Sequence, residues 1–379
     1  MDKKYTANTD PLLKEIKWWV VLLLLCLVCA AFSQVKYANA STGVSLPSGF
    51  DLQAHRGGRD ARPENTLPAF AYALALGVTT LELDVQITGD GAMVVWHNKS
   101  IPWYMAKNGW GKFIVADEQP DIRYWKLADL KSFDLGVMSP DAPYGYWQSH
   151  GMTQKKVPGT TICTLEEVFK LVKDWGNNQV FLNVETKSDP YPVNPANPEP
   201  AVWVTKFYDL VVKYELQNRV MLQSFDWRAL REMKKLDPRI ATVALTANQP
   251  SWNAEGDEGD YQWIGRGKPS PWMAGLDIRD FDNNVVLAAH AIGADVISTD
   301  HTEVTQQTIA DAHKRGMRIV PFTVNSPGRM RELILMGVDG IITDRPSTLR
   351  AVCEELGIAT PPPDPDPVGK PYYSGLDGL

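Results

Sequence analysis

The most chemically capable stretch of the chain is HRGG, residues 55–58, which ends a β-type run and precedes a helical pattern. The imidazole of His55 can exchange a proton at neutral pH, because the ordinary pKa of histidine is about 6.5. The guanidinium of Arg56 can hold phosphoryl oxygens with paired hydrogen bonds. We expect the glycines to let the backbone approach a ligand closely. We expect Asn65 or Thr66 to cap the helix, whose N-terminus favours an anion.

Three acidic residues form a second group. Glu82 and Asp84 are two residues apart in a β-rich run, so both carboxylates point to the same side of the strand. Glu185 occupies a similar run further along the chain. If the three meet, they form an all-oxygen site for one Ca²⁺ or Mg²⁺ ion. The alternative is a set of solvated strand-end acids, each with a separate cationic partner.

A second histidine, His97, ends the VVWHN run that follows the Glu82/Asp84 strand. Two imidazoles beside a bound metal ion could accept one proton and donate another. Displacement at phosphorus requires this pair, because the nucleophile loses a proton and the leaving oxygen gains one. Lys187 would join Arg56 in holding the phosphoryl oxygens. The candidate site thus contains His55 and His97 for proton transfer, Arg56 and Lys187 for substrate, and Glu82, Asp84 and Glu185 for metal.

Eight β-rich runs alternate with amphipathic helical patterns and would position these residues. The runs are 51–57, 79–87, 180–187, 220–225, 240–246, 295–300, 318–324 and 340–344. This alternation predicts an α/β fold with a parallel sheet, and eight repeats favour a (β/α)8 TIM barrel over a doubly wound open sheet. Polar residues recur at the carboxyl ends of the runs, where barrel enzymes carry their active sites. They include Ser224, Asp300, Asn325 and Asp344.

Residues 98–160 interrupt this rhythm after the second predicted strand. The segment is rich in aromatic residues: Trp103, Tyr104, Trp110, Trp125, Tyr144 and Trp147. Such density predicts a packed subdomain inserted over the barrel mouth, where its aromatic side chains could wall the substrate pocket. We expect the Pro-rich tail, residues 356–379, to be exposed. Cys163 and Cys353 are expected to be buried thiols without a disulfide.

The composition and the N-terminus limit the partners of the protein. With 379 residues, 44% hydrophobic and a net charge of −7, the chain can bury a large core but does not suit nucleic acid binding. Residues 1–40 predict a signal peptide or a membrane anchor, because lysines precede fifteen apolar residues at 18–32. Ala38-Asn39-Ala40 offers a cleavage site. We therefore expect a periplasmic or extracellular protein that contacts the membrane only if this segment is uncleaved.

The order of motifs across residues 50–355 resembles the glycerophosphodiester phosphodiesterase family. The motifs are HRGG…PENTLPAF, LELDVQITGDGAMVVWHN, NVETK, LQSFD, PFTVN and GIITDRP. The resemblance implies a TIM barrel with residues 98–160 inserted after its second strand, and one divalent ion, Ca²⁺ or Mg²⁺. It implies that His55 accepts a proton, that His97 donates one and that Arg56 binds phosphate. The implied reaction converts a glycerophosphodiester to sn-glycerol 3-phosphate and an alcohol.

One departure from the family pattern and two other interpretations of the function remain open. The family usually has Asp after the second histidine, where this chain has Asn98; an amide can orient the imidazole but cannot raise its basicity as a carboxylate would. A barrel of this kind could also act on lipids, as a lysophospholipase D or a sphingomyelinase D-like phosphodiesterase. A third interpretation is a surface binding module without catalytic activity.

Overall fold

The computed structural model describes residues 43–142, 154–191, 197–249, 260–364 and 369–372. Residues 1–41 form one unit of the chain and the remainder forms a second, and the description below concerns the second unit. The predicted N-terminal targeting segment, residues 1–40, lies outside the described residues. Across the described part of the chain, the search for a helix of sufficient length and apolarity to cross a membrane finds none.

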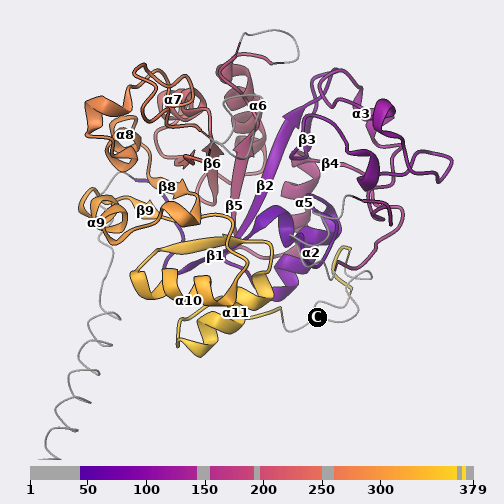
Figure 1. Ribbon diagram of the computed structural model, residues 1–379. Coiled ribbons are helices and arrows are strands. Elements are labelled where there is room, and N and C mark those ends of the chain that lie inside the picture. The colour runs from indigo at the N-terminus through magenta and orange to yellow at the C-terminus, as the bar shows by residue number, and fades with distance from the viewer. Residues whose placement is uncertain (1–42, 143–153, 192–196, 250–259, 365–368, 373–379) are drawn as a thin grey trace, which may run out of the picture. The chain divides into compact units, whose positions relative to one another are not determined.

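Eight parallel strands form the barrel, each at a position predicted from the sequence (Figure 1). They are β1 (Asp51–Ala54), β2 (Thr80–Ile87), β5 (Phe181–Thr186), β6 (Val220–Ser224), β7 (Ala241–Thr246), β8 (Val296–Thr299), β9 (Arg318–Ile319) and β10 (Gly340–Thr343). Their order is β10-β1-β2-β5-β6-β7-β8-β9. Backbone hydrogen bonds close the ring between the segments of β9 and β10: Val324 N donates to Ile342 O, and Ile342 N donates to Pro321 O, both at 3.0 Å. The predicted TIM barrel is confirmed.

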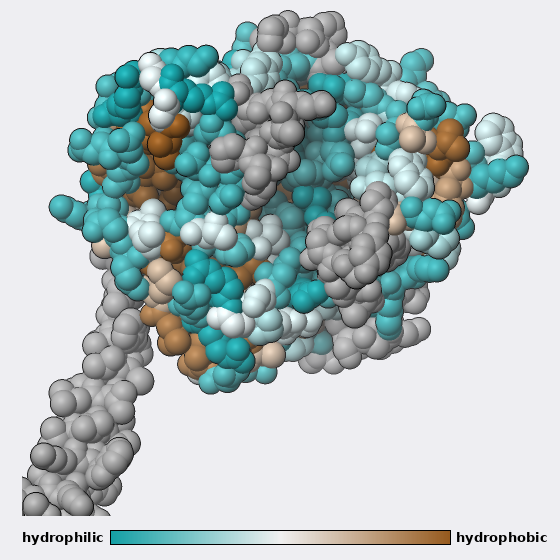
Figure 2. Space-filling view, viewed as in Figure 1, coloured by the Kyte–Doolittle hydropathy of each residue, from teal (hydrophilic) through white to brown (hydrophobic). Residues whose placement is uncertain are grey.

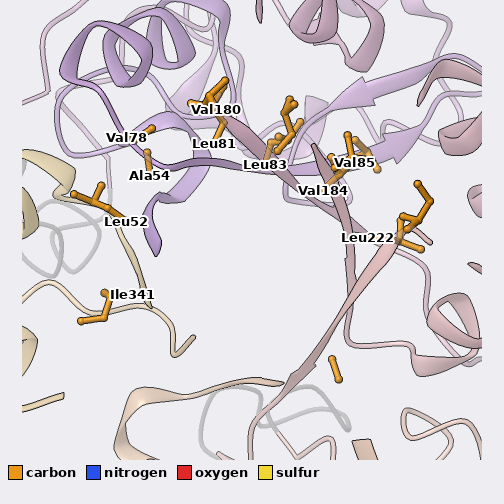
Figure 3. Close-up of a cluster of buried hydrophobic side chains, with 14 of the residues drawn as sticks. Leu52, Ala54, Val78, Leu81, Leu83, Val85, Val180, Val184, Leu222 and Ile341 are labelled. Atoms are coloured by element: carbon orange, nitrogen blue, oxygen red, sulfur yellow. The ribbon is translucent and has the colours of Figure 1, made fainter. Parts of the chain in front are cut away.

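Helices cover the outer side of the strands. They are α2 (Leu67–Leu76), α5 (Leu165–Trp175), α6 (Pro200–Lys213), α7 (Trp227–Leu236), α8 (Val285–Ala291), α9 (Gln306–Lys314), α10 (Pro327–Met336) and α11 (Pro346–Glu355). Alternate strand residues such as Leu81 and Leu83 belong to the core between strands and helices (Figure 3). Glu82 and Asp84, which alternate with these leucines along β2, therefore face the barrel interior, because successive side chains of a strand point to opposite sides.

The segment after β2 forms a small packed unit of its own. β3 (Met93–Val95) pairs antiparallel with β2, and β4 (Cys163–Thr164) pairs antiparallel with β3. Between them lie the short helices η2 (Trp103–Met105), η3 (Ala116–Glu118) and α3 (Leu127–Leu130). A separate apolar cluster that includes Ile101, Leu130 and Phe133 holds this segment together. Tyr144 and Trp147 lie outside the described residues.

The C-terminal tail is attached to the barrel rather than fully exposed, at least as far as residue 364. The Asp364 carboxylate accepts a hydrogen bond from the indole of Trp175 at 2.8 Å, and the Arg350 guanidinium donates to the carbonyl of Pro361. Residues 356–364 are exposed or half-buried, so this part of the tail lies on the surface as expected, although these hydrogen bonds hold it to the barrel. Cys163 and Cys353 are buried and unpaired, as predicted.

Candidate active site

His55 lies directly after β1, in the short 3-10 helix η1 (His55–Gly57). Its Nδ1 lies 2.5 Å from Oδ1 of Asp344, the residue that follows β10. Nε2 of the same ring lies 4.0 Å from Oε2 of Glu82. The amide of Asn325 donates to the other oxygen of Asp344 at 2.7 Å, so the carboxylate is fixed on both sides. This arrangement orients the imidazole with Nε2 toward the barrel centre.

The pKa shifts of His55 and Asp344 favour a neutral imidazole beside an ionised carboxylate. Burial alone would raise the pKa of Asp344, but the cation of Arg59 and the contact with His55 outweigh it and lower the pKa. Burial and the charge of Arg56 lower the pKa of His55, although Asp344 acts in the opposite direction. His55 is therefore neutral at pH 7, with its Nδ1 proton donated to Asp344. From the sequence alone, Asp344 is recognisable only as a polar residue at the end of a strand, and not as the partner of His55.

The backbone of η1 holds part of the acidic cluster. Arg56 has a left-handed conformation (φ 51°), and its N–H donates to Oε2 of Glu82 at 2.9 Å. Gly57 follows with φ 82°, and a Cβ at this position would lie 2.8 Å from the Cβ of Ala69 in α2. Gly57 is therefore needed because helix α2 packs against the turn, and the close approach of these glycines to a ligand stays a prediction.

The start of α2 contributes a second contact to the acidic cluster. Thr66 is the N-cap, and its hydroxyl accepts from the N–H of Ala69. Asn65 is the other capping candidate, but its side chain instead donates to Oδ2 of Asp84 at 2.9 Å. Its backbone has φ 55°, a conformation that asparagine tolerates better than most residues. The amide therefore fixes the orientation of the Asp84 carboxylate.

The three predicted metal ligands meet at one point. Glu82 and Asp84 lie on β2, and Glu185 is the register partner of Asp84 on the neighbouring strand β5. One carboxylate oxygen of each lies within 4.8 Å of the others, and all three side chains are buried. The cluster could hold one divalent ion, because oxygen ligands in this number and closeness suit Ca²⁺ and Mg²⁺.

The pKa values of the cluster reflect repulsion among buried acids. Burial and the charge of Asp84 raise the pKa of Glu82 well above its ordinary value. Burial also raises the pKa of Glu185, to about 7. Burial would raise the pKa of Asp84 as well, but the nearby Lys187 and His97 outweigh it and lower the pKa. A dication would relieve this repulsion, so the residues present fit a metal ion.

Two cations border the acidic cluster. The ammonium of Lys187 lies 2.8 Å from Oδ1 of Asp84 and 2.6 Å from Oε1 of Glu185. The guanidinium of Arg56 lies 3.3 Å from Oδ2 of Asp84 through Nε and donates to Glu64 through a second nitrogen at 2.7 Å. Both side chains also line the central cavity, where they could contact an anion.

His97 follows β3 and faces the same cavity. Its Nδ1 lies 2.8 Å from Oδ1 of Asn98. The side-chain amide of Gln86, on β2, donates to the carbonyls of His97 and Asn98 at 3.1 Å and 3.3 Å and so holds their backbone. Burial and the charges of Arg56 and Lys187 keep the pKa of His97 well below the ordinary value for histidine. The amide of Asn98 thus orients the ring, as expected.

All these groups surround a cavity of about 410 Å³ at the carboxyl ends of the strands. Its lining includes His55, Arg56, Glu82, His97, Glu185 and Lys187. Figure 2, viewed as in Figure 1, shows a recess of largely hydrophilic surface near its middle. The structure thus brings six of the seven predicted residues to the cavity wall, with Asp84 directly behind them.

The opposite side of the cavity is largely aromatic, although Asp300 and His301, after β8, also line it. Phe225 follows β6, Tyr261 follows β7 and Phe322 follows β9. The rings of Phe225 and Tyr261 stack with centroids 4.0 Å apart, and Phe322 meets Phe225 edge-on at 5.8 Å. The aromatic density of the insert predicts that its side chains wall the pocket. Among the described lining residues, however, the aromatic ones come from these later loops.

Two imidazoles beside two cations and a buried acidic cluster suit displacement at phosphorus. The profile of the Glycerophosphoryl diester phosphodiesterase family matches residues 55–348, and the chain belongs to this family. It is a phosphoric diester hydrolase that acts on glycerophosphodiesters.

Individual relatives agree with this assignment. The glycerophosphodiester phosphodiesterase of Caldanaerobacter subterraneus subsp. tengcongensis is 29% identical over 296 residues, covering 78% of this chain and 94% of the relative. The Bacillus subtilis glycerophosphodiester phosphodiesterase is 25% identical, covering 88% and 97%. A crystal structure from Silicibacter pomeroyi, titled a putative glycerophosphoryl diester phosphodiesterase, has a TM-score of 0.68 with 26% identity and covers 85% of this chain and 99% of that chain.

Proposed function

We propose that this enzyme converts glycerophosphodiesters to sn-glycerol 3-phosphate and an alcohol with one bound Ca²⁺ or Mg²⁺ ion, held by Glu82, Asp84 and Glu185. The observation that carries the proposal is the meeting of these three buried carboxylates beside the cavity lined by His55 and His97. Bound there, the ion would polarise the phosphoryl oxygens and draw the diester to the centre of the site.

In this proposal the proton transfers are divided between the two histidines. His55, oriented by Asp344, accepts the proton of the attacking oxygen at Nε2. His97, which the lowered pKa leaves neutral in the free site, would gain a proton when the anionic diester binds and would donate it to the oxygen of the departing alcohol. A phosphorus–oxygen bond forms to the nucleophile and another breaks to the alcohol. Arg56 and Lys187 bind the phosphoryl oxygens, whose negative charge they compensate.

A product assay on glycerophosphocholine with and without chelator tests the proposal. EDTA should abolish choline release, and added Ca²⁺ or Mg²⁺ should restore it. Glu82→Ala should be inactive and His55→Ala should lose at least about 10²-fold in kcat, although both variants are folded as judged by circular dichroism. Full activity in the presence of EDTA would refute metal dependence, and normal activity in either variant would remove that residue from the mechanism.

A lysophospholipase D-like activity is the second candidate, favoured by the aromatic side chains that line the cavity. An acyl chain would need an extended apolar surface. The cavity that adjoins the first is partly polar, with Asn98, Lys99 and Asp189 in its lining. We therefore rank it lower. Faster choline release from lysophosphatidylcholine than from glycerophosphocholine would reverse this order.

We further propose that the enzyme is exported and acts on small glycerophosphodiesters in the periplasm or outside the cell. This proposal rests on the apolar run at residues 18–32 and the small residues at 38–40. N-terminal sequencing of the exported protein tests it: a start near residue 41 indicates cleavage, and an intact start indicates a membrane anchor.

A further inference from the structure

A second cavity of about 400 Å³ adjoins the first at His97. Both cavities are lined by His97, Glu185, Lys187, Phe225 and Tyr261, whereas His55 lines only the first. The proposed function assigns proton donation to His97, which requires the oxygen of the departing alcohol to lie within hydrogen-bond distance of that ring. If that assignment holds, the alcohol extends into the second cavity, which we call the alcohol cavity.

One part of the lining of the alcohol cavity is aromatic. Phe225, Tyr261 and Trp272 contribute their rings. Trp272 meets Tyr261 edge-on, with centroids 4.9 Å apart, and is itself buried. Because the rings pack against one another, they form a rigid surface that could accept the C–H face of a ring, a carbon chain or a quaternary ammonium group, so the charges of the cavity decide among them.

The rest of the lining is polar and offers both donors and acceptors. It consists of Gln86, Asn98, Lys99, Ser100, Ser188 and Asp189, together with the shared residues. Gln86, Asn98 and Ser188 also form hydrogen bonds within the protein. Their remaining capacity, with Ser100, Lys99 and Asp189, still offers donors and acceptors to several alcohol hydroxyls. An apolar face combined with a polar remainder therefore fits a polyhydroxy alcohol.

The charges disfavour a cationic alcohol such as choline. Asp189 and Glu185 are the two carboxylates among the described lining residues, and each is paired with a lysine. The ammonium of Lys99 lies 3.6 Å from Asp189, and that of Lys187 lies 2.6 Å from Glu185. Asp189 also accepts from the side-chain amide of Asn197 at 2.8 Å. A trimethylammonium group would meet compensated carboxylates and two nearby ammonium groups.

We propose that the alcohol cavity selects a neutral polyhydroxy alcohol as the leaving group and disfavours choline. The inference rests on the proposed function, because His97 defines the side on which the alcohol departs. It extends that function by naming the class of substrate and the residues that select it, namely Trp272 for the apolar face and Lys99 for the exclusion of cations.

Steady-state kinetics on three substrates, with saturating Ca²⁺ or Mg²⁺, test the inference. Glycerophosphoinositol carries a neutral ring, glycerophosphoglycerol a neutral open chain, and glycerophosphocholine a cation. We expect kcat/KM to be at least roughly tenfold higher for the neutral substrates than for the choline ester. A ring preferred over the open chain would indicate stacking on Trp272, and equal rates would indicate that the hydroxyls alone are recognised; either result supports the class.

Two variants test the assigned residues. Lys99→Met should reduce the ratio of kcat/KM for the neutral substrates to kcat/KM for the choline ester by a factor of about three or more, because it removes a nearby positive charge. Its side chain is about half exposed, so the variant should fold. Trp272→Leu should raise KM for glycerophosphoinositol with little change in kcat. Trp110→Leu, at a residue that is 87% exposed in the insert, is the matched control and should change nothing.

The outcomes separate this inference from the proposed function. If the enzyme hydrolyses all three esters but prefers the choline ester or does not discriminate, the inference fails and the proposed function stands. If Lys99→Met leaves the preference unchanged, the assignment to Lys99 fails. If no ester is hydrolysed with either metal, the proposed function fails, and this inference fails with it.

Discussion

The two walls of the central cavity differ in chemistry. The wall at the ends of β1, β2 and β5 is charged: His55, Arg56, Glu82, Glu185 and Lys187. The wall at the ends of β6 to β9 is largely aromatic and apolar, with Phe225, Tyr261 and Phe322, and its titratable exceptions are Asp300 and His301 after β8. The difference indicates that one side of the barrel provides the groups that react with the substrate, whereas the other side sets the shape of the space that the substrate occupies.

The same division continues into the barrel interior. On the side of β1, β2 and β5, the interior is polar: Asn183 donates to Gln53 at 2.9 Å, and Thr80 donates to Asp51 at 2.6 Å. On the side of β6 to β8, apolar residues such as Met221, Val243 and Val296 fill the interior. The charged wall therefore rests on a hydrogen-bonded layer, which holds its side chains in place.

The largest effect is expected at the acidic cluster. Glu82→Gln should reduce kcat/KM to background, because it removes a metal ligand at the centre of the charged wall. Because the pKa of Glu82 is raised in the folded protein, this residue lowers the free energy of unfolding at pH 7 in the absence of metal. In EDTA the variant should therefore unfold at the same or a higher temperature than the wild type, as measured by calorimetry. A lower unfolding temperature with residual metal-dependent activity would contradict the assignment.

The histidines should come next. His55→Ala and His97→Ala should each lower kcat by about 10²- to 10⁴-fold, the range for loss of a general acid or base. An aryl phosphodiester whose leaving group needs no proton separates the two roles. On that substrate His97→Ala should recover most of its activity, whereas His55→Ala should not. Equal recovery in both variants would remove the proposed division of proton transfers.

A smaller effect is expected at Asp344, which positions His55 without contacting substrate. Asp344→Asn should lower kcat by about 10- to 100-fold, since the imidazole loses its charged partner. Activity needs neutral His55 and so rises as pH passes upward through its pKa, which burial already holds below the ordinary value. Asp344 acts to raise the pKa of His55, so its loss should move the acid limb of the pH–rate profile to lower pH. An unmoved limb would indicate a purely structural role for Asp344.

The smallest effect is expected on the aromatic wall. Tyr261→Leu should raise KM severalfold and leave kcat nearly unchanged, because the ring contacts substrate equally in the ground state and the transition state. The measurement is a full substrate titration of the variant and the wild type. A kcat loss as large as that of Asp344→Asn would show that the two walls do not divide the work as described.

The sequence predicted much of the charged wall. Strand alternation places Glu82 and Asp84 on one side, and the parallel order of β2 and β5 brings Glu185 beside them. The contact between His55 and Asp344 was not predicted, because these residues are 289 positions apart and meet only when the barrel closes. The aromatic wall was missed for a similar reason: Tyr261 and Trp272 lie in the connection after β7, which has no pattern that points to a pocket.

The metal centre can be tested by equilibrium binding of Ca²⁺ to the whole protein, measured by titration calorimetry. We expect one ion per chain in the wild type, one ion in His97→Ala, and loss of that binding in Glu82→Gln and in Glu185→Gln. Binding that persists unchanged in both glutamine variants would contradict a metal centre built from these carboxylates.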